Sequence, residues 1–96
     1  MSTYLMLSTI GPDGMATLRK HPERLREVNS EVEAMGVRII GQWALLGPYD
    51  FATVIESPDE HTVTRVAVAL GARGTLKTRT LTAVPVDEFL DALQDR

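Results

Sequence analysis

The sequence contains no cysteine and only two histidines in 96 residues. Without cysteine, disulfides, thiolate metal sites, iron–sulfur clusters and a cysteine nucleophile are excluded. No apolar run approaches the about 20 residues that cross a bilayer, and no basic segment followed by an apolar core stands at the N-terminus. We therefore expect a cytoplasmic protein without a membrane partner.

Neither sign of charge dominates the sequence. The 13 acidic and 10 basic residues are interspersed along the chain and leave a net charge of −3. This pattern offers no basic stripe that could neutralise a run of phosphates, so a nucleic-acid partner is not expected. Hydrophobic residues make up 44% of the chain and charged residues 24%, close to the averages of globular proteins. Residues 1–96 are expected to form a single domain.

Apolar periodicity and turn residues predict the secondary structure. Pro22 separates a short helical turn from a main helix, and Gly36 ends that helix. Ser57 is expected to cap a second helix, in a capping box with Glu60. The predicted order is a strand at 3–10, a turn at 15–20, a helix at 22–35, strands at 37–46 and 51–56, a helix from 57 to about 71–74, a strand at 75–84 and a short C-terminal helix carrying Val86, Phe89, Leu90 and Leu93.

This order predicts an α+β fold of the ferredoxin-like β-α-β-β-α-β type with a short C-terminal helix. Right-handed crossovers around a central hairpin give a four-stranded antiparallel sheet with both main helices on one face. The strand at 37–46 is apolar on both sides, so the open face needs a cover. A second copy of the sheet would provide it, and the hypothesis is a homodimer, or higher homo-oligomer, that closes into a dimeric α/β barrel.

The hairpin carries a Gly-x-Tyr-Asp motif, Gly47, Tyr49 and Asp50, which resembles the GYD family of small bacterial and archaeal proteins. The likeness runs over nearly the whole chain. Two departures are Gly36-Val37, where the family has a glycine pair, and Pro48, which stiffens the turn. The other matching residues are Thr9, Ile10, Gly11, Pro22, Glu23, Arg24, Glu56, Pro58, Asp59, Gly74, Thr78, Thr80 and Leu81.

The resemblance implies a GYD-like domain and oligomers similar to the dimeric α/β-barrel proteins, which enclose a cavity. That group includes cofactor-independent monooxygenases, isomerases and ligand-sensing domains. The family has no agreed general activity, and a likeness of fold does not assign chemistry.

Tyr49 and Asp50 are the first candidate ligand-binding residues, because the end of the hairpin sets a phenol beside a carboxylate. The structural alternative is that Asp50 accepts amide hydrogen bonds within the turn while the Tyr49 ring packs over an edge.

Thr78 and Thr80 alternate with Arg79 on the last strand, so the threonines could line a polar cavity and the arginine could bind a carboxylate. The structural alternative, which is favoured, is that the threonines are β-branched strand formers and the arginine keeps an exposed sheet edge from pairing. Tyr4 and Trp43 could form an aromatic wall of a pocket, or pack in the core or a dimer interface.

His21 and His61 stand at helix starts among charged residues and are interpreted as solvated. No metal site and no cofactor are predicted.

Two functions of different classes remain open, beside a third, purely structural possibility in which side chains fill the interior and the protein works only through its outer surface. The first is a homo-oligomeric domain that binds a small apolar or aromatic molecule or acts as a regulatory or assembly module. The alternative is a cofactor-independent oxygenase or isomerase whose aromatic substrate lies against Trp43, Tyr4 and Tyr49.

Overall fold

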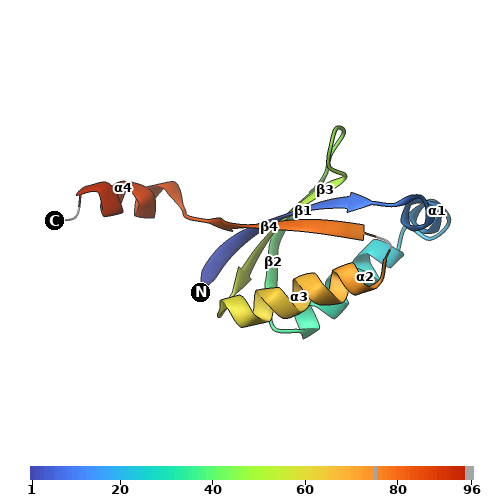
Figure 1. Cartoon of the computed structure of the whole chain (residues 1–96), viewed down its shortest axis with the longest axis horizontal. Helices are drawn as coiled ribbons and strands as arrows, with labels where there is room; N and C mark the ends of the chain where they lie inside the picture. The colour runs from blue at the N-terminus through green and yellow to red at the C-terminus, as the bar shows by residue number, and fades with distance from the viewer. Residues whose placement is uncertain (75, 95–96) are drawn as a thin grey trace.

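The computed structural model describes residues 1–74 and 76–94 and has the predicted α+β architecture. Its four strands form one antiparallel sheet in the order β2-β3-β1-β4, which is the ferredoxin-like order (Figure 1). The elements are β1 (Ser2–Ile10), α1 (Pro12–Lys20), α2 (Arg24–Ala34), β2 (Arg38–Ala44), β3 (Phe51–Ser57), α3 (Glu60–Ala72), β4 (Leu76–Ala83) and α4 (Val86–Gln94).

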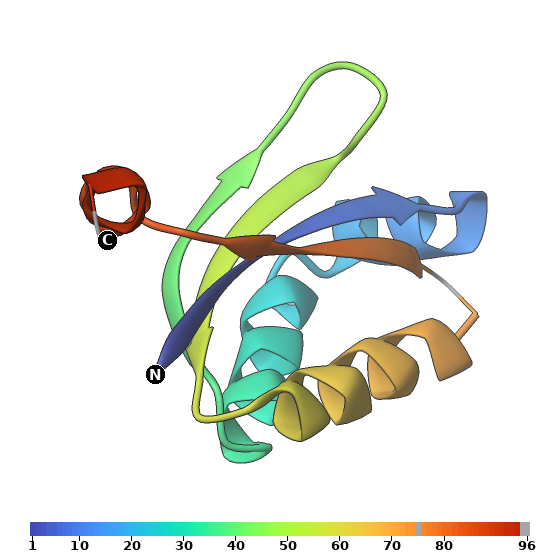
Figure 2. The same ribbon diagram turned by 60° about the vertical axis from the view of Figure 1, so that its left-hand side comes forward.

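Helices α2 and α3 cover one face of the sheet, and the hydrophobic core lies beneath them (Figure 2). Successive side chains of a strand point to opposite faces, so every second residue of the central strands enters this core. Tyr4 pairs with Ile55 and Met6 pairs with Thr53 in the β1–β3 register, and these four share the core face. The buried apolar residues are Tyr4, Met6, Val32, Val37, Ile55, Val63, Val66 and Leu70.

The opposite face of the sheet carries no helix (Figure 2). Leu5 and Leu7 of β1 face this side next to Val54 and Ala52 of β3, and Trp43 of β2 follows as the partner of Ala52. The Trp43 ring lies over Gly41, where an added Cβ would come within 2.8 Å of a ring carbon, and 56% of the residue is exposed. The predicted bare, apolar face is therefore present in the single chain.

Strand β2 owes its two-sided apolar pattern partly to a register shift between Ile39 and Gly41. Ile39 packs against the core, whereas Gly41 and Trp43 face the open side. Ile40 occupies the extra position of this bulge and is about half exposed. The run of apolar residues thus reflects a change of face along the strand.

Helix α4 stands clear of the rest of the molecule at the end of β4, opposite to α1 (Figure 1). Its amphipathic pattern agrees with the predicted C-terminal helix, but its apolar side is exposed in the single chain. The exposed residues are Val86, Phe89, Leu90 and Leu93.

Three local predictions need correction. The stretch expected as a turn at 15–20 is a full helix, α1, since Pro12 suits its first position and Arg19 and Lys20 complement its C-terminal dipole. The main helix begins at Arg24 instead of residue 22, and β2 ends at Ala44 instead of residue 46. Residue 75, the expected first residue of the last strand, lies outside the described residues.

The cap of α3 also differs from the expectation. Asp59, not Ser57, is the N-cap, and its Oδ1 accepts from the Thr62 N–H at 2.8 Å. Ser57 ends β3, fully buried, and its hydroxyl donates to the Asp59 carbonyl at 2.9 Å. The bonds with Thr62 hold the pKa of the Asp59 carboxyl below its usual value. The predicted stop of α2 is confirmed, because Gly36 has φ 109° directly after the C-cap.

Candidate functional site

Asp50 ties the β2–β3 hairpin to the end of β1. Its Oδ2 accepts from the Ile10 N–H at 2.7 Å, and its own N–H donates to the Ser8 carbonyl at 2.8 Å. Its carbonyl accepts from the Leu45 N–H at 2.8 Å, which closes the turn. The side chain therefore accepts its hydrogen bond from a neighbouring strand, whereas the structural alternative expected it to accept from amides within the turn.

Tyr49 lies beside Asp50 in the same connection and is half-buried. Its hydroxyl takes part in none of the hydrogen bonds found among residues 1–74 and 76–94. The turn before it exposes Leu46 completely, and Gly47 adopts φ 144° there. The structure thus gives Asp50 an architectural contact and leaves the Tyr49 phenol available.

Tyr4 and Trp43 lie on opposite faces of the sheet. Tyr4 is 5% exposed in the core beneath the helices, whereas Trp43 shares the open face with Leu7, because both pair with Ala52. The two aromatic side chains therefore do not form one wall in this chain.

The candidates on β4 are also divided between the two faces. Thr78 and Thr80 pair with Ser8 and Met6 and share their helix-covered side, whereas Arg79 pairs with Leu7 on the open side and is exposed. The Thr80 hydroxyl is buried and has no hydrogen-bond partner among the described residues. The expected alternation along this strand is confirmed, and its threonines are the inward residues.

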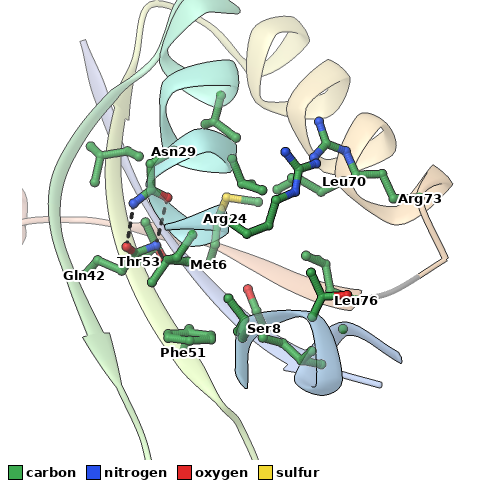
Figure 3. A pocket seen from close by; sticks show the side chains of 18 of the residues that line it. Met6, Ser8, Arg24, Asn29, Gln42, Phe51, Thr53, Leu70, Arg73 and Leu76 are labelled. Carbon is green, nitrogen blue, oxygen red and sulfur yellow. Dashed lines mark hydrogen bonds between the residues drawn. The ribbon is translucent and has the colours of Figure 1, made fainter. Parts of the chain in front are cut away.

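A pocket of about 310 Å³ lies between the sheet and the helices (Figure 3). It occupies the side opposite to the one where a cavity was expected, and none of the seven candidate residues lines it. Its walls come from β1, β2, β3, β4, α1, α2 and the end of α3, and are largely apolar. The lining residues used below are Met6, Val28, Phe51 and Ile55, the amide and hydroxyl residues Asn29, Gln42 and Thr53, and the two arginines Arg24 and Arg73.

Three polar side chains form a closed hydrogen-bond group in one wall of the pocket (Figure 3). The Asn29 amide donates to Gln42 at 2.7 Å, and the Gln42 amide donates back to Asn29 at 3.2 Å and to the Thr53 hydroxyl at 3.0 Å. This group fixes α2 to β2 and β3. Because the three satisfy one another, they can stand in an apolar wall at little cost.

Two arginines stand at the other side of the pocket, where α2 begins and α3 ends (Figure 3). Arg24 binds Glu27 at 3.1 Å and Glu31 at 3.3 Å, and Arg73 also binds Glu31, across the gap between the two helices. The hydrogen bond that Arg73 donates to Glu31 is the main reason why the pKa of Glu31 is below its usual value. The hydrogen bond that Arg24 donates to Glu27 is the main reason why the pKa of Arg24 is raised.

Sequence reasoning missed this pocket and its polar residues. Arg73 falls at the predicted helix end at 71–74, and Arg24 is one of the residues that match the GYD family; neither position by itself marks a site. The available signal was topological: the start of α2 and the end of α3 lie at the same end of a ferredoxin-like fold, so basic residues at both meet in space.

Within residues 1–74 and 76–94, no three His, Asp or Glu side chains gather as a metal would require. Nor is any helix in that part of the chain long and apolar enough to cross a bilayer.

Comparison with known proteins adds three findings. The family model named GYD domain matches residues 4–93. The glutamine synthetase and cystathionine beta-lyase binding protein of Thermus thermophilus is 48% identical over 95 residues, which are 98% of this chain and 100% of that protein. The crystal structure of FFRP-DM1 superimposes with a TM-score of 0.55 at 18% identity, over 88% of this chain and 100% of that one, which supports the fold alone. The chain belongs to the GYD domain family.

Proposed function

We propose that this protein is a homo-oligomeric regulatory protein that works by binding a metabolic enzyme. The observation that carries the proposal is the large apolar surface that the single chain leaves without a partner, on the open sheet face and on α4. A relative that matches it from end to end is named as a binding protein of two enzymes, which supports a role of the same kind.

The open sheet face suits a second copy of the chain. Leu5, Leu7 and Val54 form its centre and Trp43 stands at one side, while the basic edge residue Arg79 lies at the other. A two-fold axis brings the same apolar patch of two chains together and removes both from water. The result is the dimeric α/β barrel that the two-sided strand predicted.

Helix α4 suits a groove on the enzyme. Its exposed apolar residues, Val86, Phe89, Leu90 and Leu93, follow the i, i+3, i+4, i+7 spacing of helices that lie in a partner's hydrophobic groove. The other side of the helix carries acidic residues, including Asp87, Glu88 and Asp91. The helix projects from the body of the single chain, which leaves its apolar side exposed there (Figure 1).

Binding to purified glutamine synthetase and cystathionine β-lyase from the same organism tests the proposal. We expect the immobilised wild-type protein to bind at least one of them in biolayer interferometry. Phe89→Ser with Leu90→Ser should weaken binding strongly if these residues are the anchors of the interface, because truncating a hot-spot residue costs about 2 kcal/mol or more. The control is Val68→Ser, which changes another exposed apolar helix residue. If neither enzyme binds, the proposed role is wrong.

Sedimentation velocity tests the oligomer and separates the two surfaces. At micromolar concentration we expect a species of at least twice the 10.6 kDa chain mass. Leu5→Glu, whose cross-strand neighbours Val54 and Leu81 are both apolar, should shift it toward the monomer by burying an unpaired charge in the interface. The double α4 variant should keep its mass. A reduced mass for the α4 variant would instead assign that helix to contacts between copies.

A further inference from the structure

We propose that the pocket between the sheet and helices α2 and α3 binds a small apolar monocarboxylate, with Arg24 and Arg73 holding its carboxylate. This ligand site goes beyond the proposed enzyme binding and does not depend on it. It also lies apart from the open sheet face and from α4, the two surfaces assigned to protein partners.

The size and lining of the pocket determine the ligand body. The volume of about 310 Å³ lies at the lower end of ligand sites and, at about 30 Å³ for each water-sized group, holds roughly ten non-hydrogen atoms. Met6, Val28, Phe51 and Ile55 offer apolar contacts from β1, α2 and β3. A linear or branched chain, or one aromatic ring, fits this space.

The charges determine the head group. Arg24 and Arg73 are the two charged residues in the lining, and among the described residues no acidic side chain lines the pocket. Their side chains approach each other from α2 and the end of α3 (Figure 3). The two guanidinium groups share Glu31, and the other partner of Arg24, Glu27, is 61% exposed. Each guanidinium has five donors in a planar fork, so both retain donors for a further carboxylate.

Other ligand classes fit less well. An ammonium group would find no acidic partner in the described lining of the pocket, where the charged side chains are those of Arg24 and Arg73. A sugar or other highly hydroxylated molecule would leave its polar groups against apolar side chains. The polar wall of Asn29, Gln42 and Thr53 already satisfies its own hydrogen bonds, so an apolar tail can pass it without leaving those groups unpaired.

Titration of the full-length ¹⁵N-labelled protein with octanoate tests this inference. Octanoate has ten non-hydrogen atoms, and we expect saturable shifts of amides in β1, β3, α2 and the end of α3. Octan-1-ol and octylammonium serve as neutral and cationic probes of the same chain length, and both should bind at least about tenfold more weakly.

Variants assign the contacts. Arg24→Gln and Arg73→Gln should each lower the affinity for octanoate by about tenfold while leaving the affinity for octan-1-ol unchanged. Arg26→Gln, on the exposed side of α2, is the matched control and should bind as the wild type does. Val28→Phe should fill the pocket and weaken all three probes. Thermal unfolding of each variant checks that it is folded. Arg73→Lys keeps the positive charge but lacks the planar guanidinium, so its affinity for octanoate should lie between those of Arg73→Gln and the wild type.

Three results would overturn the inference. The first is that octanoate fails to bind the wild type up to millimolar concentration. The second is that it binds both arginine variants as tightly as the wild type, and the third is that it shifts amides of the open sheet face around Trp43 instead of those of the pocket. The enzyme-binding assay is separate, since loss of enzyme binding does not alter the octanoate titration. The two proposals can therefore fail independently.

Discussion

Replacing Asp50 with alanine removes the side chain that joins the hairpin to β1. The Ile10 N–H, which donates to Asp50 Oδ2 at 2.7 Å, then loses its partner at the half-buried end of the strand. A hydrogen bond to a charged group contributes about 1.5–3 kcal/mol, so we expect a loss of ~2 kcal/mol in the free energy of unfolding. For a domain of this size, that lowers the melting temperature by roughly 8–16 °C.

Thermal and urea unfolding, at one fixed protein concentration because the chain is expected to oligomerise, measure this loss. Asp50→Asn keeps an acceptor oxygen without the charge and should lose about half as much. Asp91→Ala, which removes an exposed carboxylate from α4, should change stability by less than about 0.5 kcal/mol. If Asp50→Ala unfolds like Asp91→Ala, the bond to Ile10 does not hold the hairpin and the reasoning is refuted.

Two further predictions concern helix ends. Asp59→Ala should destabilise the protein at pH 7 by removing the cap on the Thr62 N–H. Because folding lowers the pKa of Asp59, the loss of unfolding free energy relative to the wild type is full at neutral pH and should shrink as the pH falls below about 4. Unfolding curves at pH 7 and pH 3 measure it, and an equal difference at both would contradict the assignment. Gly36→Ala should cost at least about 1 kcal/mol because of its φ of 109°, whereas Gly71→Ala, in α3 with open space around the added Cβ, should be neutral or stabilising; equal urea midpoints would refute this contrast.

The order of elements could be predicted because each long element has its own apolar periodicity and is bounded by turn or capping residues. Gly36 ends α2 with a positive φ, and the alternation of Thr78 and Thr80 with Arg79 places one set beneath the helices. These are local signals that the tertiary structure reinforces. The β2 pattern was ambiguous for a physical reason, since the bulge at Ile40 changes the face on which successive residues lie.

The pocket could not be predicted from such signals. Its volume depends on how far α2 and α3 stand apart, which is a property of packing and not of either helix sequence. Arg73 meets Glu31 over a separation of 42 residues, so neither residue alone marks a site. The opposite placement of Tyr4 and Trp43 followed from the strand register, which the sequence pattern of two separate strands did not determine.

Trp43 fluorescence tests the central claim, that the open sheet face is where copies of this chain meet. Trp43 is the single tryptophan of the sequence, and 56% of it is exposed in the single chain. We predict a blue-shifted emission, protected from acrylamide quenching at micromolar concentration, that changes to an exposed signal when the protein is diluted and the oligomer dissociates. An emission that is exposed and quenchable at all concentrations, while sedimentation still reports an oligomer, would contradict the account, because the copies would then meet through another surface.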